Sequence, residues 1–479
     1  MREANRLPSY GAISGAAIPT VTIVKEGSSY VARKGIDGEK ISTSSNFSTI
    51  CNAAIAWITG RGTISIKDPG VDVIVPSTIT VTDKSIHIYG NNTVLDFSAL
   101  DNIVFRFRDT SGHAVLDCGI HDFQCKGAYM STSQIFAKFE DVIATATNIF
   151  TLGSTDKVYC GFYLYGNCSW SQISNCRGQF RNFVIILDNG ADDSDNCSIF
   201  DNNLDLAYEA GEFTYFLQTT DADYCKVANN TIKNSVYGIT AETSKYMLVT
   251  GNNMTGGVTA ISLGVSCDFS TVIGNVIMDG YADFNAIYID SAYGTSIVGN
   301  IIYSVSNVGF IGIKLNTIRR VLITGNEIYI AGTSATNYGI YDAGTSQEVL
   351  IVNNIITSES SYNYTGIRIV TSLTDGHIAF NEIRNCTGTP ISVGATSNGF
   401  IFRNTGYKTQ AEGATATVAD GGAINHGLVG TPTGVVVSTS VSAEFASVIT
   451  LDTAHFHVAI KKHDGSAGTT QTIYWYAWI

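Results

Sequence analysis

One six-residue phrase recurs along the chain at a nearly constant interval, and this repeat limits the possible folds more than any other feature. The phrase reads Ile or Val, two variable residues, Asn, one variable residue, then Ile, Leu or Met; VIGNVI, from Val272 to Ile277, is one copy. The interval is about 25 residues, which is typical of stacked repeats. The repeated asparagines are Asn202, Asn230, Asn252, Asn275, Asn300, Asn326, Asn354 and Asn381, with a frayed copy at Asn404.

A second phrase, most often Gly-Ile, precedes most copies by 10 or 11 residues, as at Gly238–Ile239 and Gly312–Ile313. Each repeat therefore holds at least two short alternating strands separated by turns rich in Gly, Ser, Thr and Asn. No helical period accompanies them, and the leucine spacing of leucine-rich repeats is missing. The pattern predicts an all-β chain built from the coils of a parallel β-helix.

The recurring asparagine has a structural explanation in such a fold. Coils stack about 4.8 Å apart, so equivalent residues of successive coils form ladders along the axis. We expect the residues from Asn230 to Asn381 to form one inward ladder, in which each amide donates to one neighbouring coil and accepts from the other. The residues at Val272 and Ile277 should also point inward, and Gly274 should allow a tight corner with positive φ.

Composition excludes several classes of partner. The formal net charge of −13 disfavours binding to nucleic acid, and no apolar run reaches the roughly 18 residues of a membrane-spanning helix. The start, Met1 to Arg6, lacks the apolar segment of a secretory signal, and the ten cysteines form no CxxC pair. These features indicate free thiols in a chain that folds in a reducing compartment.

The two ends of the repeat differ from its middle. Residues 1–45 should hold an arm and a hairpin of Val21–Val24 with Tyr30–Arg33. Residues 46–408 should form the β-helix, with a helix over 46–59 that covers the exposed end of the first coil. Residues 409–479 alternate like a small β-sandwich. Because the final strand is apolar on both faces, we expect both to be buried, one of them in a subunit interface.

A family resemblance rests on three stretches of the chain. The helix, the segment Gly60–Ile66 and the coil that ends Ile88–Asp96 resemble the start of pectate-lyase-like right-handed parallel β-helices. With its separate C-terminal module, the chain is similar to viral tailspikes and receptor-binding proteins of phages and archaeal viruses. The terminal Tyr474–Trp478 stretch looks like the small β-sandwiches, H-type lectins among them, that end viral fibres.

The resemblance implies a homotrimeric protein of the virion tail, held together by the C-terminal module or binding glycan through it. Such a protein contacts other virion components and binds, and in some cases depolymerises, a host cell-surface polysaccharide. Two alternatives stay open: a secreted extracellular polysaccharide hydrolase or lyase, and a non-catalytic adhesin or structural filament protein. The hydrolase signatures of the family (Gly-His-Gly, Arg-Ile-Lys and Asn-Thr-Asp) are missing, so no catalytic residue is transferred from it.

Acidic residues at strand ends are the candidate catalytic groups. Asp188, Glu242 and Asp290 each lie three residues after an apolar strand residue, in alternate coils, with Thr219 and Gly264 in between. Acids two coils apart are about 9.6 Å apart at the backbone, close to the roughly 6.5–9.5 Å of inverting glycosidases. Chance placement of acids at strand ends is the competing explanation.

An acid-rich stretch surrounds the first of these residues. Ten acids and no Lys or Arg lie between Asn182 and Cys225, with Asp192 and Asp193 in a predicted loop that bulges near 190–196. Crowded carboxylates raise one another's pKa, as a general acid requires. A solvated acidic loop, or a calcium site of oxygen ligands, is the preferred explanation of the stretch; no other cofactor is expected.

Tyrosines are the candidate sugar-binding residues. Tyr288 and Tyr341 share one outward slot, and Tyr303 and Tyr329 share another in adjacent coils. Flat aromatic faces suit sugar rings, although tyrosine also packs at subunit contacts.

Two further polar positions have mainly structural explanations. Asp342 takes a slot that neighbouring coils fill with Leu315 and Ile369, so we expect it to shape a turn. His455 and His457 share one strand face; near a threefold axis they would suit a transition metal, and otherwise they form a polar face.

Overall fold

The computed structural model describes residues 20–35, 38–67, 69–112, 116–127, 134–152, 158–187, 194–206, 214–278, 284–304, 309–331, 336–360, 362–397, 399–407 and 410–479. The chain divides into two compact units. The first comprises residues 1–210 and 214–226, and the second comprises residues 211–213 and 227–479.

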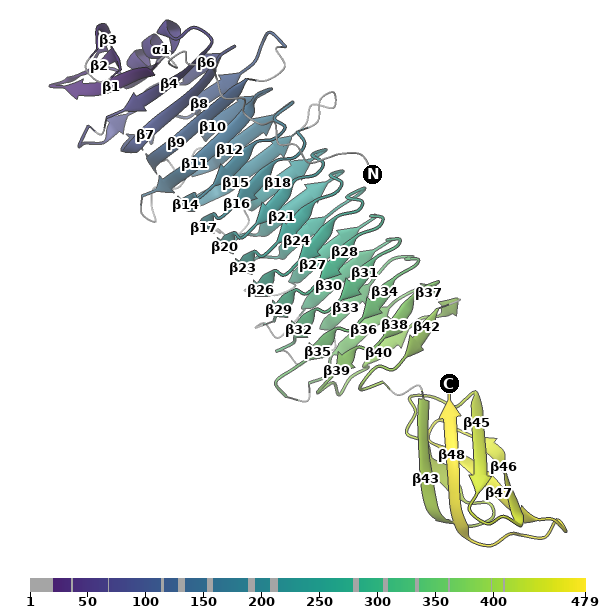
Figure 1. The fold of residues 1–479 in the computed structure, drawn as a ribbon. Coiled ribbons are helices and arrows are strands. Elements are labelled where there is room, and N and C mark those ends of the chain that lie inside the picture. Colours follow the sequence, from purple (N-terminus) through teal and green to yellow (C-terminus); the bar gives the residue numbers. More distant parts are fainter. Residues whose placement is uncertain are drawn as a thin grey trace. The chain divides into compact units, whose positions relative to one another are not determined.

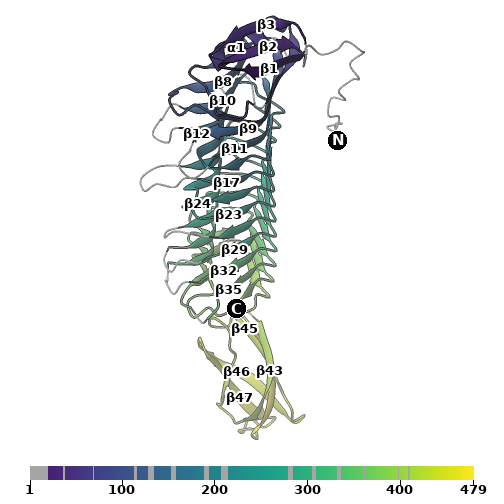
Figure 2. The ribbon, with the colours of Figure 1, turned by 90° about the vertical axis from the view of Figure 1, so that its left-hand side faces the viewer.

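The first unit begins with an antiparallel hairpin and one helix. β1 (Thr20–Glu26) pairs with β2 (Ser29–Lys34) around a turn at Gly27, which confirms the predicted hairpin, and β3 (Lys40–Ser44) pairs with β2. The helix α1 (Phe47–Trp57) follows, and its N-cap Asn46 accepts a hydrogen bond from the Thr49 backbone N–H at 3.0 Å. Figure 2 shows α1 with these strands at the N-terminal end of the unit.

The helix covers the first coil with its apolar face. Phe47, Ile50, Ala54 and Ile58 are fully buried, whereas Trp57 is 37% exposed. The helix packs against β2, β3 and β6 (Ile79–Thr82), and the Ser48 hydroxyl donates to the Ser77 carbonyl at 2.7 Å. These contacts keep the edge of the coil away from solvent, as expected from the sequence.

The coils of the first unit contribute strands to two parallel sheets, called sheet A and sheet B here. Phenylalanine rings fill the space between the sheets; Phe107 and Phe139, for example, stack with centroids 4.9 Å apart. In sheet A lie β4 (Arg61–Ile66), β5 (Val73–Ile74), β7 (Ser85–Asp96), β9 (Asp117–Lys126), β11 (Ile143–Thr151), β13 (Gln172–Ser174), β14 (Arg177–Gly178), β16 (Ser198–Phe200) and β17 (Asn203–Asp205). In sheet B lie β6, β8 (Ile103–Arg108), β10 (Ile135–Glu140), β12 (Val158–Tyr165), β15 (Phe180–Leu187) and β18 (Tyr215–Thr220).

Most coils of the second unit have one strand in sheet B and then a pair of short strands in sheet A, and the last coil adds only β42 (Phe400–Phe402) to sheet A (Figure 1). The sheet B strands are β21 (Tyr237–Glu242), β24 (Thr259–Leu263), β27 (Asn285–Asp290), β30 (Ile311–Asn316), β33 (Tyr338–Asp342), β36 (Thr365–Ile369) and β40 (Ile391–Val393). The sheet A pairs are β22 and β23 (Leu248–Thr250, Asn253–Thr255), β25 and β26 (Thr271–Ile273, Val276–Met278), β28 and β29 (Ser296–Val298, Ile301–Tyr303), β31 and β32 (Leu322–Thr324, Glu327–Tyr329), β34 and β35 (Leu350–Val352, Ile355–Thr357), and β38 and β39 (His377–Ala379, Glu382–Ile383).

Each sheet A pair turns its corner at the repeated asparagine, and these asparagines form the predicted ladder. From Asn230 to Asn381, each backbone N–H and each side-chain amide donates to the side-chain oxygen of the asparagine in the next coil, at 3.0 and 2.9 Å. Asn404 ends the series. The residue before each asparagine has positive φ, 64° at Gly274 for example, and Val272 and Ile277 are fully buried. The predictions for these positions are confirmed.

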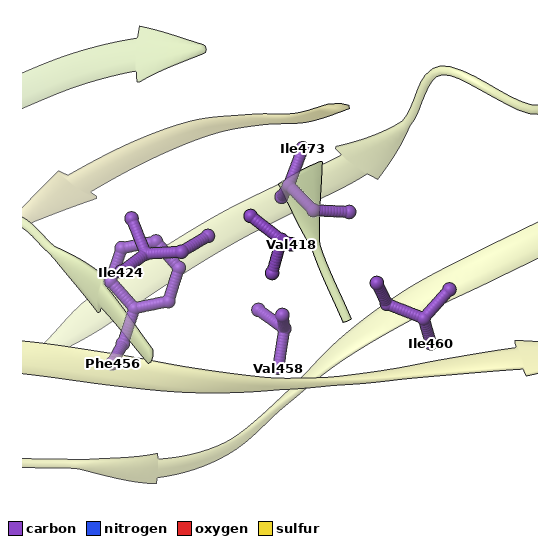
Figure 3. Packing of buried hydrophobic residues seen from close by; sticks show 6 residues of the cluster. All are labelled: Val418, Ile424, Phe456, Val458, Ile460 and Ile473. Atoms are coloured by element: carbon purple, nitrogen blue, oxygen red, sulfur yellow. The ribbon is translucent and has the colours of Figure 1, made fainter. Parts of the chain in front are cut away.

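The C-terminal strands form two three-stranded antiparallel sheets. One sheet contains β43 (Gln410–Val418), β48 (Gln471–Trp478) and β45 (Gly434–Thr439). The other contains β44 (Ala423–Asn425), β47 (His455–Lys462) and β46 (Glu444–Leu451). Side chains of both sheets meet in one apolar core, as Figure 3 shows: Val418, Ile424, Phe456, Val458, Ile460 and Ile473. This packing is the expected β-sandwich.

The final strand is buried on only one face within the chain. Ile473 and Ala477 are fully buried, but Tyr474 is 51% exposed and Tyr476 is 39% exposed. The expected burial of both faces is therefore not achieved by the chain alone, because the sandwich has no third layer.

All ten cysteines are free thiols, including the neighbouring Cys197 and Cys225, as the sequence indicated. None of the described residues belongs to a helix with the length and apolar character needed to span a bilayer.

Candidate functional site

The outer face of sheet B in the second unit carries a row of alternating tyrosines and cations. Parallel pairing places Tyr288 of β27 level with Lys314 of β30, Lys314 level with Tyr341 of β33, and Tyr341 level with Arg368 of β36. All four side chains are half-buried and point away from the core, because their strand neighbours Ile289, Leu315 and Ile369 fill it. We call these four residues the cation–tyrosine row.

Each cation of the row lies over an aromatic ring. The Lys314 Nζ is 5.1 Å from the centroid of Tyr288. The Arg368 guanidinium is 5.9 Å from the centroid of Tyr341 and 5.6 Å from that of Tyr338. Tyr338 and Tyr341 stack with centroids 4.6 Å apart, and Arg368 Nη1 donates to the Tyr338 hydroxyl at 3.0 Å. These contacts fix the orientation of the side chains before any ligand arrives.

Asp290 adjoins the row and is fully engaged with protein donors. Its Oδ2 accepts from the Tyr288 hydroxyl at 2.9 Å, and its Oδ1 accepts from Asn316 Nδ2 at 2.9 Å and from Ser291 Oγ at 3.0 Å. Burial, followed by the hydrogen bond to Asp290, raises the pKa of Tyr288 to about 12. Asp290 therefore holds Tyr288 in place.

Glu242 lies in the same column of residues as Asp290, two coils away. Ala241 is level with Leu263 and Leu263 is level with Ile289, so the next residues are Glu242, Gly264 and Asp290. Gly264 leaves room for the Glu242 side chain, since a Cβ there would lie 3.2 Å from Glu242 Cγ. The register confirms the two-coil spacing of Glu242 and Asp290, and their catalytic role stays a prediction.

The third predicted acid, Asp188, lies outside the described residues, as do Asp192 and Asp193 and most of the predicted calcium loop. The alignment that led to Asp188 is wrong: Thr219 is level with Ile186 and not with position 188. The reason is that Val184 and Ile186 point into the core of the first unit and Ile185 points outward.

The four predicted tyrosines belong to two different surfaces. Tyr303 and Tyr329 are level with each other on β29 and β32 of sheet A, with ring centroids 5.9 Å apart. Tyr288 and Tyr341 lie on sheet B. The structure therefore places one pair on the same sheet as Asp290, with Tyr288 in contact with it, and the other pair on a different sheet.

Three aromatic residues in the turns after β21, β24 and β27 escaped the sequence analysis: Tyr246, Phe269 and Tyr293. Tyr246 and Phe269 both have φ near 55° and are 41% and 45% exposed. Their rings stack 5.4 Å apart, and Phe269 meets Tyr293 edge-on at 5.2 Å. Together the three rings form an aromatic surface along these turns. Tyr246 and Phe269 both lie six residues before a ladder asparagine, which would have revealed them.

The remaining candidates are Asp342, His455 and His457, and their contacts do not indicate a catalytic or metal site. Asp342 is buried, and its Oδ1 accepts from the Gly344 backbone N–H at 3.2 Å and from Ser346 Oγ at 2.8 Å, which agrees with the expected turn. His455 and His457 lie near Asp452 and Gly421. Across the described ranges, no group of three or more His, Cys, Asp or Glu residues is arranged to hold a metal ion.

Comparison with known proteins identifies the architecture. The family NosD, described as periplasmic copper-binding protein, matches residues 153–361, less than half of the chain. No curated protein sequence matches. A tailspike variant of E. coli bacteriophage HK620, solved in complex with a pentasaccharide, superposes with a TM-score of 0.59 at 13% identity, over 90% of this chain and 90% of that one. Tailspike protein 3 of bacteriophage CBA120 superposes with a TM-score of 0.57 at 11% identity.

The fold is a tailspike-like parallel β-helix. The match to the CBA120 protein covers 76% of this chain and 59% of the CBA120 protein. At this level of identity the likeness extends to the fold alone.

Proposed function

We propose that this tailspike-like protein binds a cell-surface polysaccharide and thereby attaches a virion to its host. The observation that carries the proposal is the cation–tyrosine row, which presents half-buried tyrosine rings beside hydrogen-bond donors along sheet B. Sugar rings pack on aromatic faces and their hydroxyls accept from such donors. The pentasaccharide named for the HK620 tailspike variant supports a glycan as the class of ligand.

The proposal includes assembly into a homotrimer in the virion tail. The exposed aromatic face of β48 supports a subunit interface, because Tyr474 and Tyr476 offer apolar area that the single chain leaves in solvent. A secreted hydrolase or lyase would need neither the trimer nor virion partners, and a structural filament would not need the glycan.

Cleavage of the glycan is a second candidate function, and one observation favours it. Glu242 and Asp290 lie in one column two coils apart, near the carboxylate separation of inverting glycosidases. In that reaction Glu242 would protonate the leaving oxygen while Asp290 would take the proton of the attacking water. The three donors already bonded to Asp290 favour binding over cleavage.

A polysaccharide array with paired variants tests the binding site. The full-length protein and the Tyr288→Ala/Tyr341→Ala variant are applied to purified bacterial capsular and O-polysaccharides, and binding is measured by fluorescence. Removing two stacking faces should weaken binding about 10-fold or more. Tyr303→Ala/Tyr329→Ala is the matched control on sheet A. Equal binding by the sheet B variant and the native protein would place the site elsewhere.

A further inference from the structure

The two cations of the cation–tyrosine row keep their charge uncompensated on a strongly acidic protein. The formal net charge is −13, yet among the described residues neither Lys314 nor Arg368 forms an ion pair. Arg319 and Arg320, by contrast, both pair with Glu348, at 3.1 and 2.6 Å. Lys314 and Arg368 thus place two unpaired cations on one row, two coils apart.

The contacts of these cations leave their capacity for anions free. A tyrosine face attracts the Lys314 ammonium without neutralising it. Arg368 uses Nη1 for the Tyr338 hydroxyl, and a guanidinium has five N–H donors in a fork that fits a carboxylate, sulfate or phosphate. The row therefore holds two anion-binding groups in a fixed orientation.

We propose that the polysaccharide bound by this row is anionic, with an acidic group on every second sugar. Lys314 and Arg368 receive the acidic groups, and Tyr288 and Tyr341 carry the sugars between them. The alternation follows from the register, because tyrosine and cation change places with each coil. Successive coils are about 4.8 Å apart, which is similar to the advance of an extended glycan by one pyranose ring. This inference rests on the proposed function and specifies its ligand class.

The acids beside the row set the direction in which such a glycan can extend. Asp290 and Glu242 lie toward β21, in the coils before Lys314, and would repel acidic groups placed there. The acidic sugars therefore occupy the coils of β30 and β36. The sugars over β24 and β21 would have to be neutral.

Lys138, in sheet B of the first unit, also lies over tyrosine rings but has a compensated charge. Lys138 lies 5.2 Å from the centroid of Tyr163 and 5.0 Å from that of Tyr165, which reproduces the geometry of Lys314 over Tyr288. Lys138 also pairs with Glu140 at 2.7 Å, so its charge is compensated. Replacing Lys138 removes a cation over tyrosine without removing a free anion-binding group.

The test uses the polysaccharide that the full-length protein binds best on the array. Its affinity is measured at low and at high salt before and after three separate treatments: reduction of carboxyl groups, desulfation and dephosphorylation. We expect an acidic polysaccharide, loss of binding after the one treatment that removes its charge, and weaker binding at high salt. Lys314→Gln and Arg368→Gln should each weaken binding about 10-fold, whereas Lys138→Gln should not.

The outcomes separate the two proposals. A neutral polysaccharide that loses affinity in Tyr288→Ala/Tyr341→Ala but not in Lys314→Gln or Arg368→Gln would overturn the anionic ligand and leave the proposed function intact. Absence of binding to every polysaccharide would overturn the proposed function. Lys314→Arg, which keeps the charge, should retain binding and distinguishes loss of charge from loss of shape.

Discussion

The Asn300 side-chain oxygen accepts two hydrogen bonds from Asn275, one from the side-chain amide at 2.9 Å and one from the backbone N–H at 3.0 Å. The Asn300 amide in turn donates to the Val272 carbonyl at 3.0 Å and to the Asn326 side chain at 2.9 Å. The Asn300 side chain thus links its own coil to the coil before it and the coil after it inside the core. The ladder extends by the same contacts, so its members support one another.

Replacing Asn300 by alanine should destabilise the second unit by about 3 kcal/mol or more, because several buried polar groups lose their partners at once. The measurement is the thermal midpoint together with hydrogen exchange of the coils around residues 272–326. Asn353→Gly is the control: Asn353 is exposed with φ 56°, a conformation that glycine accepts. Equal shifts in the two variants would show that the ladder adds nothing to stability.

Asp342→Asn should stabilise the second unit increasingly as pH rises. Burial raises the pKa of Asp342 from 3.8 to about 6, so between these values the folded state binds more protons than the unfolded state. Stability from this group is therefore lost as pH rises through that window, by up to roughly 3 kcal/mol. Denaturation near pH 4 and near pH 8 measures the effect. If the difference in free energy of unfolding between Asp342→Asn and the wild type is the same at both pH values, this prediction is wrong.

His121→Gln should reduce the sensitivity of the first unit to acid. Burial and the neighbouring His87, whose Nδ1 lies 3.0 Å from His121 Nε2, lower the pKa of His121 from 6.5 to about 4. Between these values the unfolded state binds more protons, so stability is lost as pH falls. The thermal midpoint, measured between about pH 7 and pH 4, should fall less steeply with falling pH in the variant. An equally steep loss of stability in His121→Gln would contradict this explanation.

Glu242→Gln tests cleavage, because it keeps the shape of the side chain and removes its titrating proton. If the protein cuts its glycan at this column, the rate should fall about 100-fold or more while binding is retained. New reducing ends and unsaturated ends are measured. Unaltered cleavage in Glu242→Gln, Asp290→Asn and Asp188→Asn would exclude these acids.

The outer face of β48 should hold the trimer together. Tyr474→Ser/Tyr476→Ser removes exposed apolar area without touching the core, so the variant should fold and sediment as a monomer while the native chain sediments as a trimer. Phe445→Ser, 49% exposed on β46 in the other sheet, is the matched control. A monomeric native chain would leave the secreted enzyme as the better explanation.

The repeat and the local patterns were enough to predict the coil, its ladder and the helix that covers the first coil. The patterns of the coil and the ladder are local and recur from repeat to repeat, so equivalent positions can be assigned by comparing the copies. Asn275 and Asn300 were predicted to be equivalent because the six-residue phrases around them are nearly the same. The hairpin and the helix followed from local patterns in the same way. The sandwich strands were predicted from alternation, but the exposed face of β48 was not, because an apolar pattern does not show which neighbour covers it.

Which outward residues share a surface depends on the packing of whole strands. Val184, Ile185 and Ile186 are all apolar, and packing alone shows that Ile185 points outward. Tyr288 and Lys314 are 26 residues apart and meet only because parallel register places them level. The repeat specifies the spacing of the core, where every coil faces the same neighbours. Outward residues need not repeat from coil to coil, because they do not fill the core. Their neighbours are therefore set by the register of whole strands and not by the residues next to them in the sequence.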